Sequence, residues 1–588
     1  MLVLFTFVST IEVIGIGLIG PFIALASRPE VVVEENSQIA WLYKQLGFTQ
    51  PSQMVAFIGI LVIVIFCVKS FTSWSIQSYI FKYSYIQRGR LVSKLMTAYI
   101  EAPYTFYLTK NSAHLIDHIV GETTKFADSV LSTLLSSTAN FITLIAISIL
   151  LCFASPLAVA SLIFIMVPLT FLFSIFKDKV RLWGKELYEA NQGIIRGVNH
   201  GLGGFKETRI IGCGPYFERE CTLQAQRYAN ASIGFYAFKL SPRFLTETML
   251  VVFLVGFTSI NLFLNKDMSE LTSTLSIFAL ASIRLIPAFS NLTSGLSALK
   301  NSSYALNQLY TDLKELETLE FDPSFYQKDH YNSSLIDHEH QQPVENSTMP
   351  FQEKIVLDRV TYSYPNTSEI ALKNISMTLA KGESIAFIGK SGAGKTTLVD
   401  VILGLLLPQS GDILVDGESI YKNLRSWQNL IGYIPQSIFL IDDTLERNIA
   451  FGLPDHLIDE NKLNKALEGA QLKEVVARLP EGIKTRVGER GVRLSGGQRQ
   501  RVGIARALYH ERDILVLDEA TSALDNETES LVTEAIQSLS GNKTMIIIAH
   551  RLTTVAHCDC IYKMEKGQIV ESGSYEQVVL KSDTFSEK

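Results

Sequence analysis

Six apolar stretches of membrane-spanning length fill most of the first half of the 588-residue chain, and they constrain its fold more than any other feature. They cover residues 2–26, 54–81, 130–153, 157–176, 245–264 and 271–289. The second stretch loses its clean apolar character at Lys69, but a tilted helix that continues into water tolerates a polar end. We therefore predict an α-helical domain with six transmembrane helices.

The basic residues between these stretches predict the orientation of the domain. Residues 82–125 and 177–243 together hold seventeen Lys and Arg, whereas the loops on the opposite side hold three. Excess positive charge stays in the cytoplasm, so both termini and the second half of the chain are expected there. A cleaved signal peptide is the alternative for residues 1–27, but no Lys or Arg precedes Arg28 to form its basic segment. Both basic stretches are expected to extend the spans as helices.

Composition excludes several other classes of protein. Hydrophobic residues make up 47% of the chain and charged residues 19%, which excludes disordered and collagen-like chains. A net charge of -6 without a concentrated basic run excludes a nucleic-acid partner. The six cysteines lack the paired spacing of a structural zinc site or a disulfide framework.

A polar segment with Pro323, Pro343 and Pro350 follows the apolar half and has little apolar periodicity. This composition is typical of a linker. We predict a transmembrane domain at residues 1–320, a linker at 321–352 and a second domain at 353–588.

A glycine-rich loop follows the apolar strand expected at residues 384–388, and a helical stretch follows the loop. The loop reads Gly389, Lys390, Ser391, Gly392, Ala393, Gly394, Lys395 and Thr396. This G-x-x-x-x-G-K-T pattern lets backbone N–H groups surround phosphate oxygens at a helix N-terminus. We predict that residues 389–397, including Thr397, bind ATP, with Lys395 on the β- and γ-phosphates and Thr396 on Mg²⁺.

A second all-apolar strand, expected at residues 514–517, ends in Asp518 and Glu519. Such a strand belongs in the middle of a parallel sheet covered on both faces. Asp518 is then placed to hold Mg²⁺, and Glu519 is placed to act as the general base toward the attacking water. Capping of a strand by two carboxylates is the simpler alternative, but the phosphate loop upstream favours hydrolysis of ATP.

The segment Leu494, Ser495, Gly496, Gly497, Gln498 precedes another helical stretch and again offers a helix N-terminus suited to phosphate. With the phosphate loop and Asp518–Glu519, this segment resembles the ATP-binding cassette (ABC) family. The resemblance implies an α/β P-loop ATPase domain in which residues 495–498 of one subunit close on ATP held by another. A chain with one such domain and one six-span domain therefore resembles a half-transporter that works as a homodimer.

Other positions match the pattern of the family. Tyr364 resembles the aromatic residue that stacks on adenine, and Gln436 resembles the glutamine that contacts Mg²⁺ and water. His550 resembles the histidine at the γ-phosphate, and residues 522–525 resemble a loop at the dimer interface. Residues 485–491 resemble the segment that contacts the membrane domain in exporters. Tyr364 and His550 each also have a purely structural alternative.

Ionisable residues stand inside or at the edge of the apolar stretches: Glu12, Lys69, Arg243, Glu247 and Arg284. Charge at membrane depth is expensive and marks either a substrate path or a partner. One hypothesis is that Lys69, Arg243 and Arg284 form a cationic stripe for an anionic head group such as pyrophosphate. The alternatives are that the acidic residues pair with basic ones between helices and that Arg243 extends to the interface.

Short motifs in the membrane half resemble those of bacterial family members that flip lipid-linked oligosaccharides. The motifs are Ile11–Glu12, residues 20–27, Ser241–Pro242–Arg243 with Glu247, and residues 284–287. The resemblance implies an inner-membrane flippase driven by MgATP, in which Lys69 replaces an expected arginine. Export of another lipid or hydrophobic compound is the alternative within the family. An ATP-gated channel or non-transporting regulator is the alternative from another class.

Overall fold

The computed structural model describes residues 2–27, 45, 48, 50–154, 156–263, 268–318, 349–365, 367–519, 526–549 and 555–580. Contacts divide the chain into two compact units. One comprises Met1–Ala102 with Thr109–Leu319, and the other comprises Pro103–Leu108 with Glu320–Lys588. Most of the predicted linker, at residues 321–348, lies outside the described residues.

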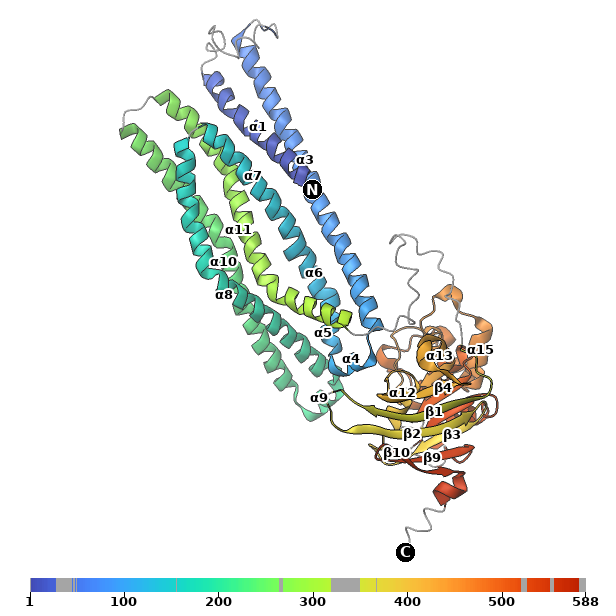
Figure 1. Cartoon of the computed structure of the whole chain (residues 1–588). Coiled ribbons are helices and arrows are strands. Elements are labelled where there is room, and N and C mark those ends of the chain that lie inside the picture. Colours follow the sequence, from blue (N-terminus) through green and yellow to red (C-terminus); the bar gives the residue numbers. More distant parts are fainter. Residues whose placement is uncertain are drawn as a thin grey trace. The chain divides into compact units, whose positions relative to one another are not determined.

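The first unit is helical (Figure 1). Its helices are α1 (Leu2–Ser27), α3 (Pro51–Glu101), α5 (Ser112–Asp117), α6 (Thr123–Lys125), α7 (Thr133–Ala154), α8 (Pro156–Gly203), α9 (Phe205–Ile211), α10 (Gly214–Phe263) and α11 (Met268–Thr318). Two π-helical turns, η2 (His118–Glu122) and η3 (Phe126–Ser132), lie between α5 and α7. A short helix α4 (Tyr104–Thr109) follows α3, and most of it groups with the second unit.

Four of these helices are much longer than a bilayer is thick. The helix α3 has 51 residues, which at 1.5 Å per residue is about 75 Å, against a hydrocarbon core of about 30 Å. The helices α8, α10 and α11 have 48, 50 and 51 residues. The structure therefore confirms that the basic stretches after the second and fourth apolar stretches continue the spans as helices, although residues 102–132 are broken into short turns.

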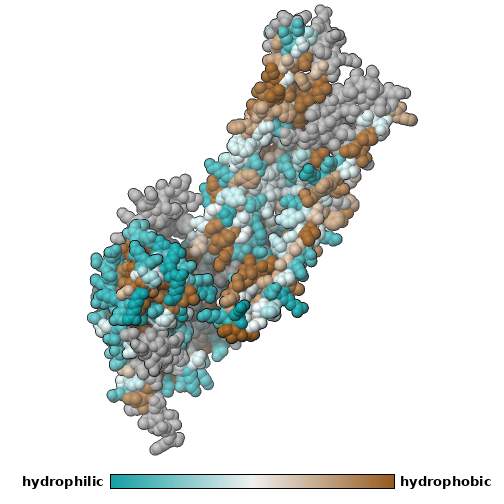
Figure 2. Space-filling model, turned by 180° about the vertical axis from the view of Figure 1, so that it is seen from behind, coloured by the Kyte–Doolittle hydropathy of each residue, from teal (hydrophilic) through white to brown (hydrophobic). Residues whose placement is uncertain are grey.

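Three helical stretches among the described residues are long and apolar enough to cross a membrane: Leu2–Ile19, Pro51–Glu101 and His114–Phe153. Large apolar side chains on α3, such as Ile60, Ile63 and Phe71, are exposed. Figure 2 shows hydrophobic side chains on outward faces of the helical unit and a mainly hydrophilic surface on the second unit. The other three predicted spans fall on α8, α10 and α11, many of whose side chains in those stretches lie outside the described set, so the count of six stays a prediction.

The second unit contains two sheets. The strands are β1 (Lys354–Ser363), β2 (Ile370–Ala380), β3 (Ser384–Ile388), β4 (Ser410–Val415), β5 (Glu418–Ser419), β6 (Ile431–Ile434), β7 (Ile514–Asp518), β8 (Thr544–Ile548), β9 (Cys560–Glu565) and β10 (Gln568–Gly573). An antiparallel sheet has the order β2-β1-β4-β5, and a six-stranded sheet has the order β10-β9-β3-β8-β7-β6. The helices are α12 (Lys395–Ile402), α13 (Leu424–Gln428), α14 (Leu445–Ile449), α15 (Glu460–Gly469), α16 (Lys473–Arg478), α17 (Gly496–Tyr509) and α18 (Asn526–Gln537).

The six-stranded sheet is the buried centre of this unit. Its strands β3, β7 and β8 consist of buried residues apart from half-buried Ile388, as expected for parallel strands covered on both faces. One apolar cluster on the sheet includes Leu515 and Leu517, and another includes Ile514 and Val516. Because β6, β7, β8 and β3 run parallel, their carboxyl ends meet at one edge, where the predicted ATP-site residues follow them.

Candidate active site

The edge formed by the carboxyl ends of the parallel strands brings together three sequence segments. The glycine-rich loop follows β3, Glu519 follows β7, and Gln436 stands two residues beyond β6. A cavity of about 350 Å³ opens at this edge. Its lining includes Tyr364, Ser391, Lys395, Thr396 and Glu519. Residues from three separate parts of the sequence, 364–371, 391–397 and Glu519, therefore share one cavity.

The glycines of the loop have backbone shapes that other residues rarely adopt. Gly389, Gly392 and Gly394 have φ angles of 147°, 81° and 99°. A Cβ atom on Gly389 would lie 2.3 Å from the carbonyl oxygen of Met564, so space as well as conformation requires glycine. Gly394 then caps α12 at its N-terminus, which points the first N–H groups of the helix toward the loop. The loop has the form of an anion cradle.

Lys395 is buried inside this cradle. Its Nζ donates hydrogen bonds to the carbonyl oxygens of Gly389 at 2.8 Å and Lys390 at 3.2 Å. Burial lowers the pKa of Lys395 from its ordinary value, while the negative charges of Glu519 and Asp518 act in the opposite direction. A phosphate at the loop offers the ammonium group better partners than two neutral carbonyls, because charged acceptors make stronger hydrogen bonds.

Glu519 is held in a specific position. The Nε2 of Gln436 donates a 2.6 Å hydrogen bond to Oε2 of Glu519. The backbone of Glu519 has a φ of 47°, an uncommon value for a residue with a side chain, and its N–H donates to the carbonyl of Ile548. Gln500 of α17 donates to the backbone carbonyl of Gln436 at 2.8 Å. The carboxylate is therefore oriented through two glutamines.

Tyr364 lies at the other side of the cavity. Its hydroxyl is 3.0 Å from the hydroxyl of Thr397 in the first turn of α12. The ring of Tyr362 packs edge-on against that of Tyr364, with centroids 5.2 Å apart. These contacts fix an aromatic ring beside the phosphate loop, where a nucleotide base can stack on it.

The segment that marks the ABC family begins α17. Ser495 caps the helix: its hydroxyl accepts from the N–H of Gln498 at 3.2 Å, and its own N–H donates to Oε1 of Gln498 at 2.9 Å. Gly496 and Gly497 form the first turn. Among the described residues, no member of this segment lines the cavity of the same chain.

Two predicted contributors lie outside the described residues. These are His550 and the segment Ser522, Ala523, Leu524, Asp525. A residue that the sequence reasoning missed is Asp400 of α12, which neighbours Asp518 electrostatically. Burial raises the pKa of Asp400 to about 6, and the charge of Asp518 acts in the same direction. The only signal in the sequence is an acidic residue within the apolar second half of α12.

The donors at this edge suit Mg²⁺. Thr396 in the first turn of α12, Gln436 after β6 and Asp518 at the end of β7 offer hydroxyl, amide and carboxylate oxygens. Hard oxygen donors of this kind are the ligands that Mg²⁺ prefers, together with the phosphates of a nucleotide. Asp518 is buried, with 6% of its surface exposed.

The predicted substrate residues differ in burial and in ion pairing. Lys69 of α3 is buried and forms an ion pair with Glu12 of α1, with Nζ and Oε1 2.9 Å apart. Arg243 and Glu247 of α10 are exposed. Arg284 lies in α11, but its side chain is outside the described set. Of the predicted cationic stripe, the described side chains are therefore those of Lys69, which is ion-paired, and Arg243, which is exposed.

Comparison with known proteins agrees with the geometry of the second unit. Residues 372–522 match the family described as ABC transporter. The ATP-dependent lipid A-core flippase of Cupriavidus metallidurans is 29% identical over 513 residues, which cover 86% of this chain and 82% of that protein. A Staphylococcus aureus protein, named as a candidate multidrug export ATP-binding/permease protein, is 42% identical over 235 residues, or 40% of each chain.

The fold also matches a solved structure along nearly its whole length. A bacterial Atm1-family ABC exporter with ATP bound has a TM-score of 0.74 to this chain at 21% sequence identity. The match covers 98% of this chain and 97% of the other. At this identity the likeness establishes the fold, an N-terminal helical domain followed by an ABC ATPase domain.

Proposed function

We propose that this chain, an ABC-type ATPase with the fold of an exporter, is a half-transporter that flips an anionic lipid-linked saccharide outward across the bacterial inner membrane. The observation that carries the ATP-driven part is the cavity that joins the phosphate loop, Tyr364 and Glu519 in one site. The substrate class rests on the relatives named as lipid A-core flippases and on the cationic residues of the helical unit.

The proposal includes a homodimer. The Ser495 helix cap is exposed and is not part of the cavity of its own chain within the described residues. A helix N-terminus with two glycines is suited to a phosphate, so a second copy that closes on the cavity would supply the missing wall. Two ATP molecules would then lie between two second units, and closure would bias two conformations of the helices.

The chemistry assigned to each residue follows from the site. Lys395 Nζ exchanges the carbonyls of Gly389 and Lys390 for phosphate oxygens when ATP binds. Glu519, oriented by Gln436, accepts the proton of the attacking water as the water oxygen bonds to the γ-phosphorus. The bond from the γ-phosphorus to the β–γ bridging oxygen breaks, and ADP leaves. Thr396, Gln436 and Asp518 would hold Mg²⁺, which supplies positive charge to the phosphates. His550 is assigned to the γ-phosphate on the family pattern alone.

The substrate assignment is the finer part of the proposal. Arg243 is exposed on α10 and offers a bidentate partner for a pyrophosphate. Lys69 is neutralised by Glu12, so a head group reaches it only in competition with that carboxylate. Arg284 completes the stripe in the proposal. Export of another lipid or of hydrophobic compounds is the second candidate, because of the Staphylococcus aureus relative.

Reconstituted vesicles test the proposal. The purified chain is expected to move a fluorescent polyisoprenyl-pyrophosphate oligosaccharide in an ATP-dependent way, with Glu519→Gln abolishing movement and hydrolysis while ATP binding persists. Glu565→Gln, a change at the end of β9, is the matched control and should retain both activities. Equal movement of a neutral-headed lipid would favour the second candidate. ATP binding without substrate-stimulated hydrolysis would indicate a channel or regulator.

A further inference from the structure

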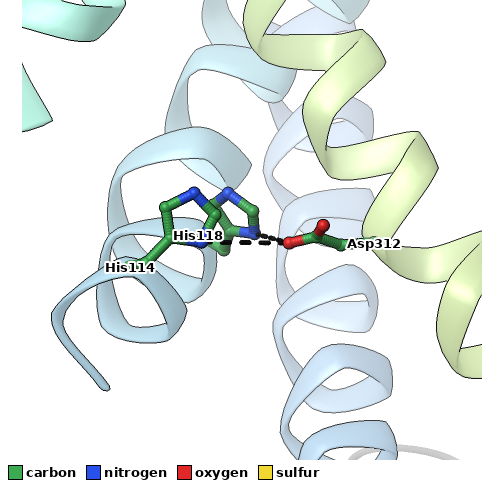
Figure 3. Close-up of side chains that lie close together, drawn as sticks. All are labelled: His114, His118 and Asp312. Atoms are coloured by element: carbon green, nitrogen blue, oxygen red, sulfur yellow. Dashed lines mark ion pairs between the residues drawn. The ribbon is translucent and has the colours of Figure 1, made fainter. Parts of the chain in front are cut away.

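A cluster of two histidines and one aspartate lies in the helical unit, apart from the residues assigned to ATP and to the transported substrate. His114 is in α5, His118 begins the π-helical turn η2, and Asp312 lies six residues before the end of α11 (Figure 3). One potential metal-ligating atom from each residue can be chosen so that all three lie within 4.8 Å of one another. The cluster joins two regions almost two hundred residues apart in the sequence.

The two imidazoles present the same nitrogen to the carboxylate. His118 Nδ1 is 3.1 Å from Asp312 Oδ2, and His114 Nδ1 is 3.9 Å from the same oxygen. Residues four apart on a helix lie on one face, and the two ring centroids are 4.1 Å apart. Figure 3 shows the Asp312 carboxylate extending from α11 toward the two histidine rings, with dashed lines to both.

The opposite nitrogens share a different partner. Nε2 of His114 is 3.1 Å from the hydroxyl of Tyr188, and Nε2 of His118 is 3.5 Å from it. Histidines that bind a metal commonly donate their other ring N–H to an oxygen, which fixes the tautomer and leaves the first nitrogen to the metal. Tyr188 of α8 is placed to hold both rings in this way.

The oxygen that faces the histidines lacks a hydrogen bond. Asp312 Oδ2 is buried and has no partner of hydrogen-bond geometry among the described residues, although its side chain is only 1% exposed. Lys110 approaches the other oxygen, Oδ1, at 3.5 Å and pairs more closely with Glu315 at 2.9 Å. The two histidine nitrogens lie at ion-pair distances from this oxygen without the geometry of a hydrogen bond, and an ion held between the three groups would satisfy the buried carboxylate.

We propose that His114, His118 and Asp312 bind one divalent transition-metal ion of the Zn²⁺ class. Two nitrogens and one carboxylate oxygen suit such an ion, whereas Mg²⁺ and Ca²⁺ prefer oxygen alone. Ligands at about 2.1 Å in a tetrahedral zinc site lie about 3.4 Å apart. The two histidine nitrogens lie 3.1 Å and 3.9 Å from the Asp312 oxygen, and all three ligand atoms lie within 4.8 Å of one another. The His118 side chain is fully buried and that of His114 is 26% exposed, which leaves the fourth position to water or to Tyr99, whose hydroxyl is 3.2 Å from His118 Nδ1.

Such an ion would tie the short helices after α3 to the last turns of α11. Because the ligands come together only in the folded chain, binding of the ion stabilises the folded state. The site is independent of the proposed substrate and of the catalytic chemistry, so each can be tested without the other.

Metal content of the full-length protein tests the inference. The chain is purified in detergent without a polyhistidine tag or nucleotide, stripped with EDTA, dialysed against Zn²⁺ and analysed by mass spectrometry for metal. We expect one tightly bound Zn²⁺ per chain and a binding constant at least about tenfold weaker in His118→Gln and Asp312→Asn. His200→Ala removes an exposed histidine of α8 and is the matched control, with parental binding expected.

Cobalt gives a second readout. Co²⁺ bound by nitrogen and oxygen should give visible d–d absorption without the thiolate charge-transfer band that binding at a cysteine produces, and Asp312→Asn should remove it. If both buried-site variants fail to fold, the partly exposed His114→Gln takes their place. Parent protein without retained Zn²⁺, or variants that retain as much as the parent, would overturn the site.

Discussion

Lys69 Nζ lies 2.9 Å from Glu12 Oε1, and the two side chains, 5% and 9% exposed, join α3 to α1. A single charge at this depth is expensive, so each partner stabilises the burial of the other. The contact agrees with the pairing alternative for Glu12. It also means that an anionic head group must displace a carboxylate before it can use Lys69.

Lys69→Met should destabilise the helical unit because it removes the ion pair to the buried carboxylate of Glu12. Removal of one member of a buried pair costs about 3–5 kcal/mol, whereas Lys69→Met with Glu12→Leu should recover most of that loss. Thermal unfolding in detergent measures both variants. Lipid transfer by the stable double variant then distinguishes a role of Lys69 in packing from a role in substrate binding. Transfer at the parental rate would show that Lys69 does not bind the substrate.

Gln436→Leu should slow hydrolysis without preventing ATP binding, because it removes the 2.6 Å hydrogen bond that orients Glu519. Loss of orientation at a reacting group costs up to about 100-fold in rate. The measurement is kcat against KM for ATP. Gln428→Leu, on α13, serves as a control for loss of a glutamine amide away from the cavity, since its Nε2 bonds only the carbonyl of Leu403 in the described structure. An unchanged kcat would show that Gln436 does not position the base.

Gly389→Ala should abolish ATP binding, because its Cβ would lie 2.3 Å from the Met564 carbonyl and the residue has a φ of 147°. Gly452→Ala is the matched control: it has a φ of 84° but nothing within 4 Å of an added Cβ. The control should cost only about 1 kcal/mol of conformational strain. Binding of a fluorescent ATP analogue and thermal unfolding distinguish the two. Equal effects would mean that space at Met564 does not matter.

Asp400→Asn should change the pH dependence of stability. Burial raises the pKa of Asp400 to about 6, so the folded state binds its proton more tightly than the unfolded chain does. Its favourable contribution is complete below the unfolded pKa of about 4 and is lost as pH rises through about 6. Asparagine resembles the protonated form, so the variant should gain up to about 3 kcal/mol relative to the parent between pH 4 and pH 8. The free energy of unfolding of the nucleotide-free parent and variant is measured with denaturant across this pH range. Parallel pH profiles for the two proteins would contradict the raised pKa of Asp400.

Features that are contiguous in sequence could be predicted well. The phosphate loop carries its own glycines, lysine and threonine and follows the apolar strand β3. A second apolar strand, β7, ends in Asp518 and is followed by Glu519, which predicts that these residues lie at the same sheet edge as the loop. The approach of Gln436 to Glu519 follows from the pairing of β6 with β7, which local sequence does not predict.

Contacts between distant helices could not be predicted in the same way. Glu12 and Lys69 both stand out in the sequence as charges in apolar stretches, but which basic residue meets which acid depends on helix rotation and packing. His114 and His118 lie four residues apart in the sequence, but Asp312 is distant from them in the sequence. Asp312 reaches the two histidines only because α11 packs beside them. Apolar periodicity specifies a buried face without specifying its neighbour.

The unbroken 51-residue span of α3 has a mechanical consequence. A hydrogen-bonded rod of about 75 Å does not absorb a tilt along its length, so a turn of five degrees about one end sweeps the other through roughly 6 Å. A small rotation at one end of α3 therefore produces a displacement at the other end that exceeds the rise of one helical turn, about 5.4 Å.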